Sequence, residues 1–255
     1  LKIETDADLQ CTPEGQVARL GSKTLMTYTK EQAEALAQER PPLQGEALAK
    51  TLREVLHLPA LPKSAPDYRI LRNVGCRQYP KKDYCTYAIE TAAEAQALVT
   101  RLSDEALTSR LPRGATKAVL YIAHRSADAE LRDEALVEEL LAAEPESAFF
   151  ACDVRGIGES QPDTCGANQF LRPYGSHYFY AAFGLMLGQP LLGQRTDDVL
   201  RVIQLLVAAG HTEIHLAGKG WGALPAALAA VLSPAVKQIT LKNALTSFQE
   251  IAVHE

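Results

Sequence analysis

Four apolar runs in the second half of the chain constrain its fold more than any other feature. They read KAVLYIAH from residue 117, SAFFACDV from 147, EIHLA from 213 and KQITLKN from 237. Segments with helical periodicity separate them, among them ADAELRDEALVEELLAA and ALPAALAAVL. Strands that are apolar on both faces and alternate with helices are typical of a parallel sheet buried between helix layers. We therefore expect an α/β fold with a mostly parallel central sheet and helices on both faces.

The region before these runs has a different pattern. Residues 68–103 contain the shorter runs YRILRNVGC, YCTYAIET and QALVTRLS, which are separated by polar turns. Their spacing predicts a small antiparallel meander. We place it with the alternating segments in one core of residues 67–255.

Residues 1–66 are interpreted as an N-terminal arm that lacks a core of its own and packs on the rest of the chain. Two short strands are expected around a turn at residues 12–15. A first helix is expected to open at Thr29, which stands in capping-box spacing, and to end at the following Pro-Pro pair. A second helix is expected over residues 45–58, where apolar residues recur at helical spacing.

Charge and composition exclude several classes of function. The formal net charge of the 255 residues is -5 at pH 7 and Lys and Arg are scattered, so we expect no nucleic-acid partner. No apolar run reaches the roughly 18 residues of a membrane-spanning helix. The five cysteines show no metal or redox spacing, and we expect neither a cofactor nor a metal. His211 and His215 are four residues apart, but they straddle the expected start of a strand and do not share a helix face. They therefore give no support to a metal-dependent hydrolase.

Two further expectations concern the environment of the chain. Cys76 and Cys85 flank RQYPKKDY, which is typical of a hairpin turn, so a disulfide and two buried free thiols are both open interpretations. The chain starts at Leu1 without an apolar leader, so we expect either processing or a longer parent protein. The compartment is left open, with a secreted or periplasmic location favoured.

Two loops follow expected strands, at the edge where ligands of such sheets bind. In CDVRGIGESQP, Asp153 ends a strand and Arg155 can reach back to carboxylate or carbonyl groups. Gly156 and Gly158 permit the positive φ of a tight turn.

In the second loop, YIAHRSADAE, the strand ends at His124, and Arg125 and Ser126 follow. His124 is either a strand-end histidine with satisfied hydrogen bonds or a catalytic residue.

The stretch HLAGKGWGALPAALA, residues 215–229, predicts a strand, a sharp turn and a helix, with small residues at Gly218 and Gly222. This is the frame of a nucleophile elbow, whose tip carries Ser, Cys or Asp. Here the tip is Gly220, which relieves a backbone strain of about 1 to 3 kcal/mol and removes the attacking atom. The backbone N–H of Trp221 would remain as a donor to an anion or a carbonyl oxygen. Lys219 precedes the tip and is expected to be solvated.

A second interpretation uses the same glycines. Gly218, Gly220 and Ala223 satisfy the GxGxxA pattern of dinucleotide-binding domains. The next strand, however, ends in Lys242 and Asn243, where that pattern requires an acidic residue.

The order of YIAHRSAD, CDVRGIGES and GKGWGA resembles α/β-hydrolases of the acetylxylan esterase-like type over residues 68–250. The resemblance implies that Trp221, together with the loop at Arg125 and Ser126, supplies backbone N–H donors to an oxyanion. It implies a structural role for a further set, namely Asp153, Arg155, Gly156, Gly158, Gly218 and Gly222.

The chain departs from that family in two ways. Gly220 stands where the family has its nucleophilic Ser. The family's acid and histidine come after later strands, and His254 is too close behind the last expected strand to match that histidine. We expect a degenerate hydrolase unit or a fragment, itself inactive or incomplete.

Two functional hypotheses from different classes remain. In the first, the chain is a hydrolase-fold domain of a carboxylic-ester hydrolase system that acts on acetylated polysaccharide or a small ester, with a companion hydrolase domain or a remaining C-terminal segment. In the second, it is a non-catalytic carbohydrate- or acyl-binding or scaffolding module, with His124, Lys219 and Tyr174 as binding residues beside Trp221.

Overall fold

The computed structural model describes residues 3–12, 15–71, 77–104, 110–111, 114–161 and 175–253. The chain divides into two compact units. The smaller unit comprises residues 1–43 with 245–255, and the larger comprises residues 44–244.

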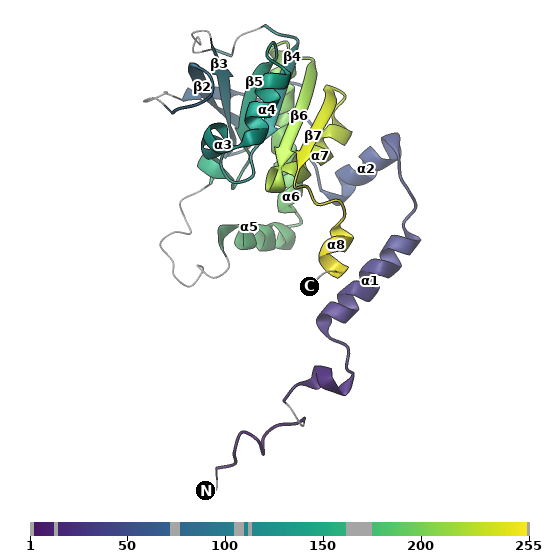
Figure 1. Cartoon of the computed structure of the whole chain (residues 1–255). Helices are drawn as coiled ribbons and strands as arrows, with labels where there is room; N and C mark the ends of the chain where they lie inside the picture. The colour runs from purple at the N-terminus through teal and green to yellow at the C-terminus, as the bar shows by residue number, and fades with distance from the viewer. Residues whose placement is uncertain are drawn as a thin grey trace. The chain divides into compact units, whose positions relative to one another are not determined.

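Among its described residues, the larger unit contains a seven-stranded sheet in the order β1-β2-β3-β5-β4-β6-β7 (Figure 1). The strands are β1 (Tyr68–Leu71), β2 (Asp83–Ala92), β3 (Ala95–Ser103), β4 (Lys117–Ile122), β5 (Ala148–Asp153), β6 (Glu213–Lys219) and β7 (Val236–Lys242). β1, β2 and β3 form an antiparallel meander, and β3 also pairs antiparallel with β5. β5, β4, β6 and β7 are parallel. The expected meander and the expected parallel strands are confirmed, and they form one mixed sheet.

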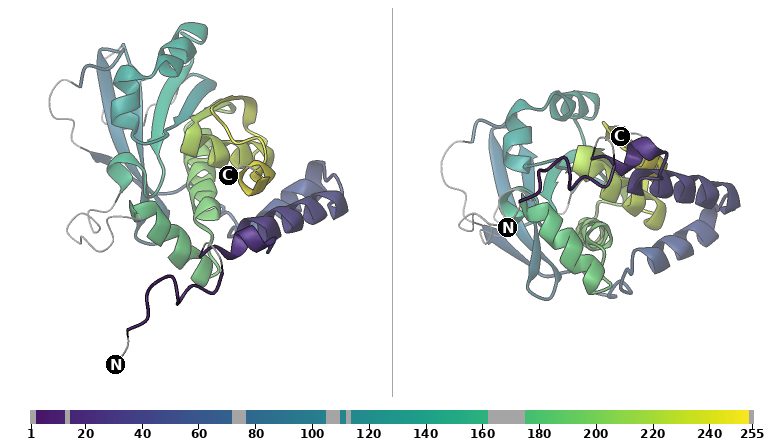
Figure 2. Two further views of the ribbon diagram at one scale, coloured as in Figure 1. Left: turned by 60° about the horizontal axis from the view of Figure 1, so that its bottom comes forward. Right: turned by 90° about the horizontal axis from the view of Figure 1, so that it is seen from below.

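Helices cover both faces of this sheet (Figure 1 and Figure 2). The helices of the larger unit are α2 (Gly45–Val55), α3 (Ala127–Asp133), α4 (Ala135–Ala143), α5 (Gly175–Met186), α6 (Leu191–Ala208) and α7 (Ala223–Leu232). Helix α6 contacts β2, β3, α5 and α7, and α7 contacts β6, β7 and α2. Helix α2, expected in the arm, thus belongs to the larger unit.

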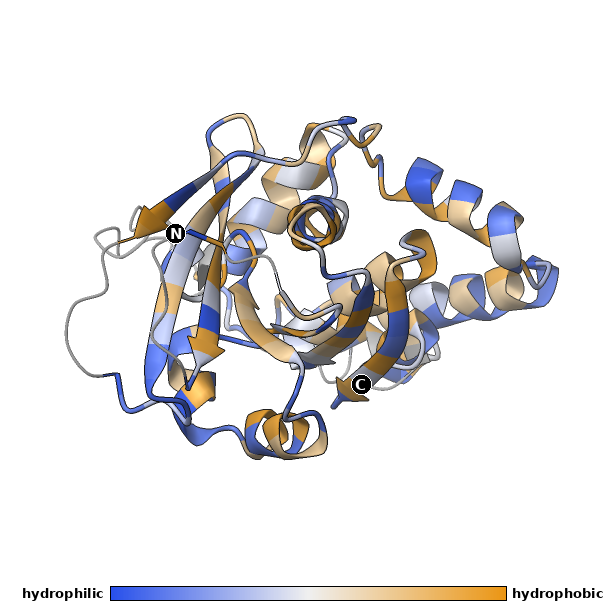
Figure 3. Ribbon diagram, turned by 90° about the horizontal axis from the view of Figure 1, so that it is seen from above, coloured by the Kyte–Doolittle hydropathy of each residue, from blue (hydrophilic) through white to orange (hydrophobic). Residues whose placement is uncertain are grey.

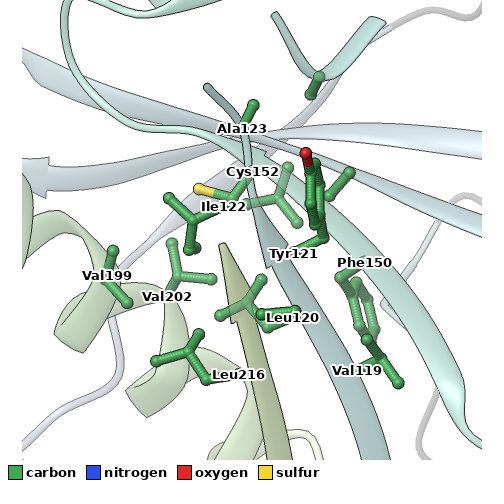
Figure 4. Close-up of a cluster of buried hydrophobic side chains, with 14 of the residues drawn as sticks. Val119, Leu120, Tyr121, Ile122, Ala123, Phe150, Cys152, Val199, Val202 and Leu216 are labelled. Atoms are coloured by element: carbon green, nitrogen blue, oxygen red, sulfur yellow. The ribbon is translucent and has the colours of Figure 1, made fainter. Parts of the chain in front are cut away.

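Alternate residues of β4 show which helices cover which face. Leu120 and Ile122 point toward Val202 of α6, whereas Tyr121 points the other way (Figure 4). The hydroxyl of Tyr121 donates to Glu130 of α3 over 2.5 Å. Helices α6 and α7 therefore cover one face, and α3 and α4 the other.

The central strands are buried at nearly every position of β4, β5 and β6, which explains their continuously apolar sequences. Figure 3 shows hydrophobic residues both on the strands and on the helices that flank them. Within the described part of the chain, no helix has both the length and the hydrophobicity needed to cross a bilayer.

The smaller unit corrects two predictions. Its described residues contain η1 (Val17–Leu20), α1 (Leu25–Glu39) and α8 (Phe248–Val253), and no strand forms in the described residues around the expected turn. Helix α1 begins four residues before Thr29, because the hydroxyl of Thr24 accepts the N–H of Thr27 and caps the helix there. Thr29 lies inside the helix.

The helical pattern after Ser126 is also broken in two. Glu134 ends α3 and begins α4, and its side chain accepts the N–H of Leu136. The cap at Glu134 interrupts the backbone hydrogen bonding that a single helix over both segments would have. Of the two cysteines that flank the predicted turn, Cys85 is buried as a free thiol, and Cys76 lies outside the described residues.

Candidate functional site

The predicted corner lies at the carboxyl end of β6. The strand runs to Lys219, a single 3-10 turn spans Gly220–Gly222, and α7 comes directly after it. A Cβ atom at Gly218 would lie 2.8 Å from the carbonyl oxygen of Gly222, and one at Gly222 would lie 2.2 Å from that of Ile122. Both positions need glycine because another backbone segment passes too close for a side chain.

The tip of the corner is filled by an imidazole ring. Gly220 adopts φ +50°, and a Cβ atom there would lie 2.5 Å from Nδ1 of His124. The same Nδ1 accepts the backbone N–H of Trp221 over 3.0 Å. The predicted oxyanion donor at Trp221 is thus already hydrogen-bonded to a side chain of the chain itself.

This contact fixes the protonation state of His124. Because Nδ1 accepts a hydrogen bond, the proton of the neutral ring is on Nε2. Burial lowers the pKa of His124, and the nearby carboxylate of Glu130 opposes that effect. The ring is therefore neutral at pH 7, which keeps Nδ1 available as an acceptor.

The second predicted group of donors is also engaged within the chain. The backbone N–H groups of His124, Arg125 and Ser126 donate to the carboxylate of Glu130 over 3.0, 2.7 and 3.1 Å. The hydroxyl of Tyr121 donates to the same carboxylate. Glu130 thus accepts the N–H groups that were expected to serve an oxyanion, and no sequence motif pointed to it.

Asp153 ties the loop after β5 to the start of α3. Its carboxylate accepts the N–H of Ala127 over 2.7 Å and that of Glu159 over 3.0 Å. A Cβ atom at Gly158 would lie 2.2 Å from the carboxylate, so glycine is needed for this approach. Burial raises the pKa of Asp153 to about 7, although the two N–H donors favour the charged form.

Arg155 ties the same loop to α6. Its guanidinium donates to Asp198 through Nε over 2.8 Å and through Nη2 over 2.5 Å, and Asp198 is fully buried. The hydroxyl of Thr91 donates to the same carboxylate. Gly156 adopts φ +72° beside Arg195, which donates to the carbonyl oxygens of Arg155 and Gly156.

Lys219 is not solvated as predicted. Its ammonium group forms an ion pair with Glu134, and Lys242 at the end of β7 binds the same carboxylate over 2.8 Å. The prediction was wrong because β6 turns this side chain toward the face covered by α4, where Glu134 caps the helix.

An aromatic pair is exposed beside the corner. The indole of Trp221 is 52% exposed and stacks on His177 with ring centroids 5.8 Å apart. His177 accepts a hydrogen bond from Arg195 over 2.9 Å if its Nδ1 is unprotonated, and burial followed by the charge of Arg195 lowers its pKa. His177 had no signal in the sequence. The predicted binding residue Tyr174 lies outside the described residues, and Tyr178 is exposed.

A cleft of about 590 Å³ lies at the same edge of the sheet. It is bordered by the loop after β5, the turn between β2 and β3, and helices α5 and α6, including Gln96, Arg155, Gly156, Tyr180, Phe183 and Gln194. Within the described residues, no group of three or more His, Cys, Asp or Glu side chains is arranged to hold a metal ion.

Comparison with known proteins was informative only at the level of structure. No family model and no curated protein sequence matches the chain. The structure of a protein named as an acetyl xylan esterase, from Bacteroides fragilis, superposes with a TM-score of 0.57 at 15% sequence identity. The match covers 90% of this chain and 63% of that one. The fold is α/β-hydrolase-like.

The chain thus spans less than two thirds of the length of that α/β-hydrolase-fold relative, with 63% of it covered. Acetyl Xylan Esterase 1 from Thermoanaerobacterium sp. matches over 76% of this chain and 57% of its own, at 12% identity and a TM-score of 0.46.

Proposed function

We propose that this chain is a hydrolase-fold module of a carboxylic-ester hydrolase system, and that its elbow carries out no covalent catalysis. The observation that carries the proposal is the contact between His124 and Gly220. The tip has no attacking atom, the imidazole lies 2.5 Å from where a Cβ atom would be, and the N–H of Trp221 is already bonded. Restoring a nucleophile at the tip would therefore require the imidazole to move as well.

The ester-hydrolase part of the proposal is supported by the name of the structural relative from Bacteroides fragilis. An acetylated polysaccharide or a small ester would be the substrate of the system. A companion hydrolase domain or a remaining segment would supply the groups for catalysis. The structural roles of Asp153, Arg155 and the nearby glycines fit a fold that is kept while the chemistry of its corner is lost.

The experiment is hydrolysis of p-nitrophenyl acetate by the purified chain and by Trp221→Ala. The two should hydrolyse at the same rate, because alanine keeps the backbone N–H of residue 221, which His124 already accepts, and the indole takes no part in hydrolysis. Loss of a serine nucleophile lowers kcat by about a million-fold in a serine protease, so a working elbow would be plain to see. A product burst in the wild-type chain whose acetyl group maps to the elbow, residues 218–222, would refute the proposal.

Two further variants test the steric part. Gly220→Ser alone should add no activity, since a side chain at this position collides with the ring of His124. The pair Gly220→Ser with His124→Ala should add no activity either, and it should unfold at higher urea than Gly220→Ser alone. Activity gained by Gly220→Ser alone would show that a complete triad is present.

The exposed indole of Trp221 favours a second function, in which the module binds carbohydrate. Aromatic faces stack on apolar faces of ligands, and this one is held flat against His177. A pull-down on acetylated xylan should retain the wild-type chain and lose Trp221→Ala. Tyr28→Ala is the matched control, because Tyr28 is another exposed aromatic residue at 58% exposure. Equal retention of all three proteins would exclude this binding mode.

Dinucleotide binding finds no such support. At the end of β7, where a ribose-binding carboxylate would be required, Lys242 binds Glu134 instead.

A further inference from the structure

A second chemical constellation lies on the α4 face of the sheet, away from the elbow. It consists of Glu144, which comes directly after α4, His215 in β6 and Thr240 in β7. His215 stands near the beginning of β6, whereas the tip of the elbow, Gly220, lies just beyond the end of the same strand. From the sequence, His215 was considered only as a metal ligand.

The three side chains are hydrogen-bonded in series. Nδ1 of His215 is paired with the carboxylate of Glu144, and Nε2 lies 2.8 Å from Oγ1 of Thr240. An ionised carboxylate can only accept, so Nδ1 carries the proton. In that tautomer Nε2 is an acceptor, and the hydroxyl of Thr240 donates to it.

In this series Thr240 has the place of a nucleophile, His215 that of a base, and Glu144 that of an acid that orients the base. A hydroxyl within hydrogen-bond reach of an imidazole, with the other ring nitrogen bonded to a carboxylate, is the general signature of an activated nucleophile. Such arrangements are recognised by geometry, whatever the order of the residues in the chain.

The packing around the series holds it in place. His215 is 6% exposed, so its ring has little freedom to leave the two partners. The carboxylate of Glu144 accepts a further hydrogen bond from the hydroxyl of Ser147 over 2.9 Å. Thr240 is held by its pairing with Ala217 across β6 and β7.

The three residues also line an open cleft of about 750 Å³, so the series is accessible to a small molecule. Two lysines and four glutamates line the cleft, namely Lys117, Lys237, Glu139, Glu144, Glu146 and Glu213. This excess of carboxylates disfavours an anionic acyl group. The chemistry suits an uncharged ester.

We propose that Glu144, His215 and Thr240 form an acyl-transfer site for small uncharged carboxylic esters. Oγ1 of Thr240 forms a bond to the acyl carbon, and the bond from that carbon to the alkoxy oxygen breaks. The proton of Thr240 passes to Nε2 of His215 and from there to the leaving alcohol. Water then attacks the acyl-threonine, with His215 taking its proton, and releases the carboxylic acid and the free hydroxyl. The site uses no group of the elbow.

The test is covalent labelling of the full chain with p-nitrophenyl acetate, followed by peptide mapping by mass spectrometry. We expect one acetyl group on Thr240. Thr240→Val should abolish it, and Thr240→Ser should restore it on the new hydroxyl. His215→Gln should slow the labelling by about 100-fold or more, as the loss of a general base does.

Thr86→Val is the matched control. Thr86 is a sheet threonine whose hydroxyl is hydrogen-bonded to that of Thr100, 3.1 Å away. This variant should label like the wild type, and circular dichroism should show all variants folded. No label on Thr240 in the wild type, or a labelling rate unchanged in His215→Gln, would overturn the proposal. The Trp221→Ala comparison leaves this site intact, so failure here is distinct from failure at the elbow.

Discussion

Nδ1 of His124 lies where the side chain of residue 220 would begin, and it accepts the N–H of Trp221 over 3.0 Å. The ring and Gly220 are therefore a matched pair: the ring needs a residue without a side chain, and the turn needs an acceptor for its N–H. Changing either partner should therefore lower the stability of the fold.

Gly220→Ala should lower the free energy of unfolding by about 2 to 3 kcal/mol. The positive φ contributes about 1 to 2 kcal/mol, and displacement of His124 from its hydrogen bond contributes about 1 more. Gly188→Ala is the control, since Gly188 has φ +66° and open space around its Cβ position. Gly188→Ala should lower the free energy of unfolding only by the contribution of the positive φ, about 1 to 2 kcal/mol. Urea unfolding of both variants, with and without His124→Ala, measures the coupling. Equal losses for the two alanine variants would rule out the steric contact.

Asp153 should make the protein less stable as pH rises from about 4 to about 7. Burial raises its pKa to about 7 in the folded chain, above the usual value near 4. The folded protein thus holds this proton more tightly than the unfolded chain. The resulting stabilisation is complete below about pH 4 and is lost as pH rises through about 7. Asp153→Asn should remove this pH dependence while lowering stability at every pH, because the two N–H groups bind different oxygens of Asp153 and an amide offers only one acceptor oxygen. A stability difference between the two proteins that stays constant from pH 4 to 8 would contradict the buried carboxyl.

Glu134→Gln should lower the free energy of unfolding by about 1 to 2 kcal/mol at pH 7. Burial disfavours the charge of Glu134, but bonds from Lys219, Lys242 and the N–H of Leu136 outweigh it and lower its pKa to about 2. The stabilisation by this carboxylate is therefore present at neutral pH and is lost only as pH falls toward about 2.

The control for Glu134 is Glu54→Gln, which breaks a 4.0 Å pair with Lys50 whose side chains are 64% and 77% exposed. Such an exposed pair contributes less than about 0.5 kcal/mol. Thermal or urea unfolding should separate the two variants, and equal effects would show that the cluster at Glu134 behaves like an ordinary surface pair.

Asp198→Asn should be the most destabilising of these changes, at about 3 kcal/mol or more. It leaves Arg155 without the charge that holds it, in a position where the carboxylate is fully buried. The loop after β5 would then lose this attachment to α6, and only the bonds from Arg195 to its carbonyl oxygens would remain. Hydrogen exchange should rise in that loop first, and an unchanged exchange pattern would contradict the bracing role.

The sequence by itself determined the elements of the sheet and the corner. Strands β4, β5 and β6 are buried on both faces and therefore have continuously apolar sequences. Positions 218 and 222 need glycine because another backbone segment passes close to them. Both features can be recognised in the local sequence. The break at Glu134 and the cap at Thr24 were missed, because a single side-chain hydrogen bond decided each of them against a regular helical pattern.

Only the tertiary structure decided which distant side chains meet at the elbow and at the two other clusters. Trp221 meets His124 across 97 positions of sequence, His215 meets Glu144 across 71, and Lys219 meets Glu134 across 85. Periodicity reports whether a residue is buried, since burial repeats with the geometry of its own helix or strand. It carries no information on which distant side chain arrives at the same point, because that depends on how separate elements pack and which rotamers then fit.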